Sequence, residues 1–203
     1  MGLQTVTWPL TGEVRHRDSI GSDALLSTGQ LNLRTSGAGI AHSEYSIGEA
    51  AIELDALQLW IALPDNARWN ARGFERHEAL PTVALTASVG DDAEATVIMG
   101  SLAGVASPAT AYSPLVGAQL RLAAGSRVRV PLDAAWEHAV VLLDGDVELP
   151  AANDGHPADG HPANGHPANG DPADGDPAGR GAVRPRRNDL VYLGTERDHL
   201  EVS

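Results

Sequence analysis

A histidine and a glutamate stand two residues apart at His42 and Glu44, directly after the glycine-rich bend Gly37-Ala38-Gly39. Side chains at positions i and i+2 of a β-strand leave its same face, so in a strand this pair would point together while Ser43 points away. An imidazole beside a carboxylate is half of a mixed site that suits first-row metals, iron(II) in particular when positions stay open. We therefore predict that His42 and Glu44 are metal ligands, with a hydrogen-bonded interior pair as the alternative.

A second histidine and carboxylate with the same spacing, His16 and Asp18, lie earlier in the chain. The same spacing would in principle allow His16 to lend a ligand to the site. The remaining histidines outside the repeat are His77, His138 and His199. We expect His77 at the surface and His138 in a core, and we predict no second metal.

Composition narrows the classes of function. The chain of 203 residues has no cysteine, which excludes disulfides, thiolate metal sites and a cysteine nucleophile. Its formal net charge of −13 repels phosphate backbones and argues against nucleic-acid binding. No run approaches the roughly 20 apolar residues that span a membrane. We therefore expect a cytoplasmic protein that binds neither nucleic acid nor membrane.

Short runs with a period of two, bounded by Gly, Pro, Asp and Asn, predict an all-β fold. The expected strands are 5–8, 13–16, 31–34, 40–45, 57–63, 95–100, 117–122, 127–130, 139–143, 147–149, 190–193 and 200–202. The run 57–63 is nearly all apolar, which is typical of a buried strand. A turn at Asp144-Gly145 predicts that 139–143 and 147–149 form a hairpin.

A five-residue repeat interrupts the last third of the chain between residues 153 and 181. Each copy contains a proline and none contains a large apolar residue, so the segment cannot build a regular ladder or a core. We predict a disordered insertion. Its three histidines, His156, His161 and His166, would be a poor metal cage.

Five segments together resemble the N-terminal domain of the pirins, a family of bicupin proteins in the cupin superfamily. They are Gly2-Leu3-Gln4-Thr5-Val6-Thr7-Trp8, Gly12-Glu13, His16-Arg17-Asp18-Ser19, the stretch from Gly37 to Glu44, and Leu57-Gln58-Leu59-Trp60. The resemblance covers residues 2–81 and continues more loosely through 113–117. It implies tandem jelly-roll-like cupin β-barrels, one over 1–105 with the metal site and one over 106–203 with the insertion.

The resemblance also implies a ligand set. Pirins bind iron(II) with three histidines and one glutamate, and His42 and Glu44 match the third histidine and the glutamate. The family pattern does not use His16 as a ligand, so the resemblance implies that His16 supports the site or lines its rim. The other two histidines belong to a His-Pro-His-x segment whose last position is Met1 here, so we expect the chain to be truncated at its N-terminus. Ser203 ends it in a strand-like run, and we expect truncation there too. With two ligands, Fe(II) or another divalent first-row metal should bind weakly.

Several pirins act as quercetin 2,3-dioxygenases. The resemblance thus implies an iron-dependent dioxygenase, or quercetinase, acting on a small aromatic, flavonol-like substrate. Glu44 would then be a catalytic residue that accepts the substrate hydroxyl proton. The alternatives are a non-catalytic regulatory module that binds a protein partner, and an inactive fragment.

Overall fold

The computed structural model of the chain describes residues 1–47, 53–151 and 182–203. They form two compact units, residues 1–83 with 94–121 and residues 84–93 with 122–203. The described residues contain strands and turns without a helix, which confirms the predicted all-β class. None of them forms a helix long and apolar enough to cross a membrane. The predicted insertion at 153–181 lies outside the described residues, and the boundary at 105/106 stays a prediction.

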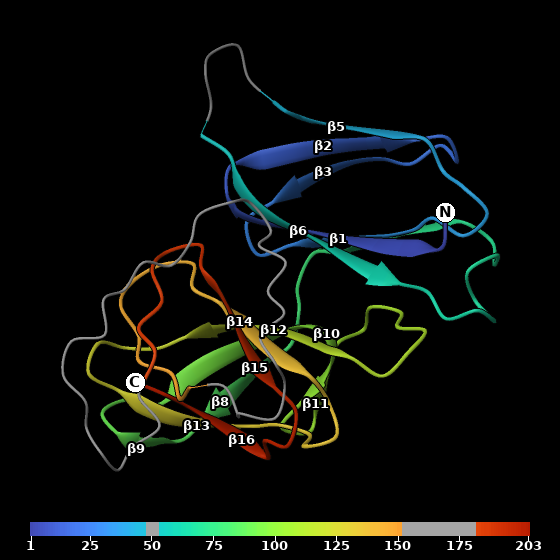
Figure 1. The fold of residues 1–203 in the computed structure, drawn as a ribbon. Helices are drawn as coiled ribbons and strands as arrows, with labels where there is room; N and C mark the ends of the chain where they lie inside the picture. Colours follow the sequence, from blue (N-terminus) through green and yellow to red (C-terminus); the bar gives the residue numbers. More distant parts are fainter. Residues whose placement is uncertain (48–52, 152–181) are drawn as a thin grey trace. The chain divides into compact units, whose positions relative to one another are not determined.

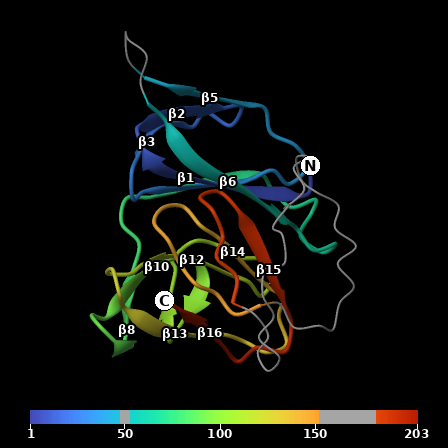
Figure 2. The same ribbon diagram turned by 60° about the vertical axis from the view of Figure 1, so that its left-hand side comes forward.

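Two antiparallel sheets of the first unit carry the residues singled out above (Figure 1). One has the order β6-β1-β4-β7, with β6 at Asp55–Ala62, β1 at Leu3–Thr11, β4 at Leu31–Thr35 and β7 at Gly73–His77. The other has the order β3-β2-β5, with β3 at Asp23–Ser27, β2 at Glu13–Asp18 and β5 at His42–Ser46. Both views show β2, β3 and β5 as a layer over β1 and β6 (Figure 2).

Alternation along β1 gives the four-stranded sheet two unlike faces. In the register of β1 with β4, Val6 lies opposite Leu33 and Thr7 lies opposite Asn32. One face packs into an apolar core formed by Val6, Trp8, Leu31, Leu33, Ile98, Met99 and Ala109. Because successive side chains of a strand point to opposite sides, Thr7 and Asn32 face the other way, toward the three-stranded sheet.

The rest of the first unit supplies the partners of that apolar face. Its strands are β10 at Ala93–Leu102, β11 at Val105–Ala106 and β12 at Val116–Arg121. They pair in the order β11-β10-β12, and β8 at Thr82–Leu85 pairs with β10. The indole of Trp8 donates to the side-chain oxygen of Gln119 on β12 at 2.9 Å, so the buried tryptophan keeps its N–H satisfied.

The second unit contains two small sheets. One has the order β16-β13-β9, with β16 at His199–Val202, β13 at Arg127–Pro131 and β9 at Ala87–Val89. The other pairs β14 at His138–Val141 with β15 at Leu190–Gly194. The predicted hairpin is therefore wrong. The partner of β14 lies beyond the repeat, where an apolar strand extends the ladder further than 147–149 can, and Leu149 instead bridges Val183.

The apolar run that we expected as a buried strand is an edge strand. β6 pairs with β1 on one side and ends its sheet on the other. Leu59 is 41% exposed and Trp60 is 70% exposed. Continuous apolar character therefore does not mark burial on both faces here, because β6 has a neighbour on one side alone in the described sheet.

Candidate functional site

The glycine-rich bend connects β4 to β5. Gly37 has a φ of +47°, and a Cβ at this position would lie 2.1 Å from the carbonyl oxygen of Asn70. A glycine is thus required there for both backbone and space. The backbone N–H of Ser36 donates to Leu3 at 2.8 Å before the bend, and Ser19 donates to Ala41 at 2.9 Å after it. These bonds fix where β5 begins.

The pairing of β5 with β2 brings the two histidine–carboxylate pairs together. Glu44 lies opposite His16, and His42 lies opposite Asp18. Cross-strand partners share a face, so all four side chains leave the sheet on one side. That side faces the polar face of the four-stranded sheet, as the hydrogen bond from Thr7 to Glu44 requires.

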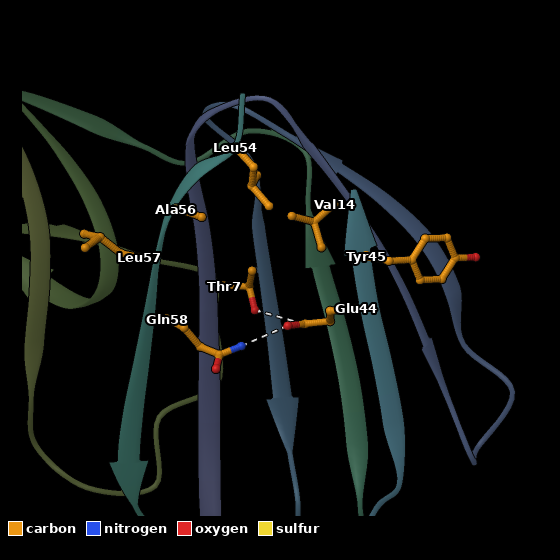
Figure 3. A pocket seen from close by; sticks show the side chains of 8 residues that line it. All are labelled: Thr7, Val14, Glu44, Tyr45, Leu54, Ala56, Leu57 and Gln58. Carbon is orange, nitrogen blue, oxygen red and sulfur yellow. Dashed lines mark hydrogen bonds between the residues drawn. The ribbon is translucent and has the colours of Figure 1, made fainter. Parts of the chain in front are cut away.

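Three side chains hold the Glu44 carboxylate. The hydroxyl of Thr7 donates to Oε1 at 3.2 Å and the amide of Gln58 donates to Oε2 at 2.8 Å, as Figure 3 shows. The Nδ1 atom of His16 lies 3.3 Å from Oε1. The hydrogen bond from His16 lowers the pKa of Glu44, against the opposing effect of burial, with a further contribution from Thr7. The carboxylate is therefore held ionised.

His16 lies between two carboxylates and is 1% exposed. Besides Glu44 it contacts Asp18, with Nε2 3.1 Å from Oδ2, and its ring stacks on Phe74 at a centroid distance of 4.5 Å. Burial lowers the pKa of His16, but the hydrogen bonds with Glu44 and Asp18 outweigh it and leave the pKa raised. Asp18 is fixed by the backbone N–H groups of Ile20 and Ser22, both at 3.0 Å.

His42 contacts an arginine from the facing sheet. Nη1 of Arg34 meets Nδ1 of His42, while Nη2 donates to the hydroxyl of Thr5 at 2.8 Å. Because a guanidinium can only donate, Nδ1 of His42 must accept, which leaves the ring proton on Nε2. Burial and the positive charge of Arg34 lower the pKa of His42, so its neutral form is favoured.

A cavity of about 140 Å³, here called the site cavity, opens beside Glu44. Residues from β1, β2, β5, β6 and the segment before β6 line it: Thr7, Val14, Glu44, Tyr45, Leu54, Ala56, Leu57 and Gln58. In Figure 3 the side chains of Thr7, Glu44 and Gln58 converge, while that of Tyr45 points away. The site cavity is smaller than the ~300–1,000 Å³ of typical small-molecule sites, so a larger ligand would extend beyond it.

The donor types fit a divalent metal, but their present arrangement does not. In the part of the chain that the structure describes, no group of three or more His, Cys, Asp or Glu could hold a metal ion. Nδ1 of His42 accepts from Arg34 and Nε2 carries the proton, so neither ring nitrogen offers a free lone pair. Both oxygens of Glu44 already accept hydrogen bonds. Oε2 of Glu44 accepts one bond and keeps a further lone pair, so a metal would require the contact of His42 with Arg34 to change rather than the bonds of Glu44.

The other residues considered from the sequence lie away from this cluster. Gln4 is fully buried on the opposite face of β1, where its amide donates to Thr35 at 3.1 Å and to the Thr110 carbonyl at 2.9 Å. His138 is buried as expected and contacts the Asp133 carbonyl at 2.9 Å. His77 is half-buried and contacts Glu75 at 3.2 Å.

Several functional contacts were missed from the sequence. Thr7, Gln58, Arg34 and Phe74 contact the histidines and carboxylates from the facing sheet. A signal for them existed in the alternation of β1 and β4, which leaves the polar residues Thr5, Thr7, Asn32 and Arg34 on one face. Which sheet that face would meet could not be read from the strands alone.

The fold and the two adjacent histidine–carboxylate pairs define a double β-barrel protein of the cupin class. Over 100% of this chain and 55% of the other, the structure superposes on a quercetin 2,3-dioxygenase from Acinetobacter baumannii, with a TM-score of 0.76 and 30% sequence identity. The model of the pirin family matches residues 1–61. In these first 61 residues the chain is therefore similar to the pirin family.

Two bacterial relatives extend the match beyond those residues. A Pseudomonas aeruginosa protein named as a candidate quercetin 2,3-dioxygenase is 40% identical over 149 residues, which is 73% of this chain and 45% of that protein. A pirin-like protein of Caulobacter vibrioides is 33% identical over 151 residues, 73% of this chain and 51% of its own length. The chain thus spans about half the length of these relatives.

Proposed function

We propose that this chain is the site-bearing part of a pirin-type bicupin with quercetin 2,3-dioxygenase-type activity. In this proposal His42 and Glu44 are two ligands of Fe(II) or another divalent first-row metal, which this chain alone binds weakly. The substrate is a small aromatic, flavonol-like molecule. The predicted cytoplasmic location is part of the same proposal. The names of the Pseudomonas and Acinetobacter relatives support the substrate class.

The observation that carries the proposal is the carboxylate of Glu44 at the wall of the site cavity. A metal in a cupin barrel supplies Lewis-acid and oxygen chemistry when it is bound. The chain's own residues position the reacting groups. Thr7 and Gln58 orient Glu44 toward the cavity, and His16 contacts its Oε1 atom through Nδ1.

Glu44 would act on the substrate hydroxyl. Its lowered pKa keeps it ionised and makes it a hydrogen-bond acceptor, but also a weaker base than an ordinary carboxylate. It would therefore accept the hydrogen bond of an acidic hydroxyl such as an enolic or phenolic one. An aliphatic alcohol, which is far less acidic, would not transfer its proton to Glu44.

A second candidate is an interaction module without catalytic activity. The edge strand β6 presents Leu59 and Trp60 to solvent, and an exposed strand edge can pair with another chain. This candidate needs no metal at His42 and Glu44. A partner protein bound with the same affinity by wild type and by Glu44→Gln would favour it over the enzyme.

The test combines metal binding with oxygen consumption. Fe(II) would be titrated under argon into the 203-residue chain, followed by an oxygen electrode measurement with quercetin. We expect weak binding that falls at least about tenfold in His42→Ala and in Glu44→Gln, because each removes one ligand. Any quercetin-dependent oxygen uptake should disappear in both variants.

Ser43→Ala is the matched control, because Ser43 lies between the two residues on β5 and points to the opposite face. It should retain the wild-type affinity. Metal binding that is equal in wild type, His42→Ala and Glu44→Gln would rule out these two residues as ligands.

A further inference from the structure

Arg34 stands out as a positive charge placed directly at the nitrogen that a metal would need. It comes from β4, whereas His42 comes from β5 of the facing sheet, so the contact spans the space between the two sheets. The second arm of its guanidinium is fixed by Thr5 at 2.8 Å. Thr5 is also the cross-strand partner of Arg34, so the register of β1 with β4 sets this bond.

We propose that Arg34 occupies the metal-binding face of His42 and excludes divalent cations from it, so that metal binding in this chain requires Arg34 to move away. The inference rests on the proposed function, since it takes His42 and Glu44 as ligands. Arg34 would then decide whether its own guanidinium or a metal ion from solution occupies the binding face of His42.

The chemistry of imidazole carries the inference. Arg34 donates to Nδ1 of His42 and thereby favours the tautomer with its proton on Nε2. A metal at Nδ1 must displace the guanidinium. A metal at Nε2 requires the proton to move to Nδ1, where it would point at the N–H of Arg34. Either route breaks the contact.

Charge acts in the same direction. The guanidinium lies in the field of the carboxylates of Glu44 and Asp18. It therefore supplies part of the positive charge that a metal would otherwise bring to these carboxylates. A divalent cation placed beside His42 would be repelled at close range by the positive charge of Arg34.

The first test does not involve metal. Long-range ¹H–¹⁵N NMR spectra of the imidazole side chains report which nitrogen of His42 carries the proton. We expect the Nε2–H tautomer in wild type and a mixture of tautomers in Arg34→Met, because methionine is similar in length but donates no hydrogen bond. A wild-type spectrum with the proton on Nδ1 would overturn the proposal, whatever the fate of the proposed function.

The second test titrates Co²⁺ into the full chain, with binding followed by calorimetry and by the visible absorption of bound cobalt. We expect Arg34→Met to bind Co²⁺ at least about tenfold more tightly than wild type, through loss of the like charge. Arg34→Lys should stay close to wild type because it keeps the charge. Arg34→Gln, neutral and polar, serves as the second variant should Arg34→Met fold poorly.

Arg17→Met is the matched control, because Arg17 lies on β2 with a half-exposed side chain that pairs with Asp23 on the outer face. It should leave Co²⁺ affinity unchanged. The gain in Arg34→Met must vanish when His42→Ala is added. An unchanged affinity in both neutral variants, or a gain that survives His42→Ala, would refute the role of Arg34, whereas wild-type binding that is indifferent to His42→Ala refutes the proposed ligand.

Discussion

The two faces of the sheet β6-β1-β4-β7 perform different tasks with the same strands. On one face Val6, Trp8 and Leu33 pack against Ile98 and Met99 in a buried apolar core. On the other, Thr7 and Arg34 reach across to Glu44 and His42. Successive side chains of a strand point to opposite faces, so apolar residues that stabilise the core alternate along each strand with polar residues that reach the site.

The apolar face should be the more sensitive to truncation. Leu33→Ala removes a side chain that is 0% exposed, and we expect a loss of about 2–5 kcal/mol in the free energy of unfolding. Urea denaturation followed by tryptophan fluorescence would measure it. A loss below 1 kcal/mol would mean that the core closes over the space and that the two faces differ less than their packing indicates.

On the polar face, replacing a buried polar residue by an apolar one should stabilise the protein. Asn32 is 2% exposed, and both atoms of its amide lack a hydrogen-bond partner among the described residues. Asn32→Leu keeps a similar size and removes the unpaired polar atoms, so we expect a gain of about 1–3 kcal/mol. The same change at the exposed Asn66 is the control and should have little effect. Destabilisation by Asn32→Leu would contradict the cost that we assign to the amide.

The interior charges should make stability depend on pH. The raised pKa of His16 means that its contribution is fully present below the unfolded value of 6.5 and is lost as pH rises through its folded pKa. We expect the stability difference between wild type and His16→Gln to shrink over that range. At acid pH, the lowered pKa values of Glu44 and Asp18 predict a loss of stability as pH falls through them.

Thermal melts of both proteins from pH 4 to pH 9 would measure this difference. If the difference in melting temperature between wild type and His16→Gln stayed constant across the neutral pH range, His16 would not couple stability to pH.

The outer face of the small sheet should respond least. Asp23 accepts from Arg15 at 2.7 Å, and this bond lowers its pKa to about 2. Both side chains are solvent-exposed, so water and salt screen the interaction. We expect Asp23→Asn to leave the thermal midpoint nearly unchanged at physiological salt. A large shift would show that exposure is a poor guide to the energetic weight of an ion pair in this molecule.

The parts of the fold that follow from short-range pattern were predictable. Alternation identified β1, β2 and β4, and the spacing of His42 and Glu44 was sufficient to place both on one face of β5. Long-range pairing was harder to predict. β14 pairs with β15 across the repeat, and a local turn signal gave no indication of that partner.

The candidate site was likewise predictable where spacing along one strand decides it, and not where packing between sheets does. His16 lies directly against Glu44, and the family resemblance rather than its spacing implied a supporting position for it. Arg34 was not recognised as part of the site, because its contact with His42 depends on how one sheet faces the other. Cross-sheet contacts are set by packing and not by any interval in the sequence, which is why residues spaced along a strand were found and residues facing it were missed.

The bend at Gly37 has a consequence for how this protein can change over evolutionary time. Point substitutions of His42 or Glu44 would leave the backbone intact, whereas any side chain at Gly37 would collide with the Asn70 carbonyl and move the start of β5. A saturation screen should therefore find Gly37 among the least tolerant positions, although it carries no reactive group. Residues of the site can therefore be exchanged one at a time during evolution, provided that Gly37 is retained.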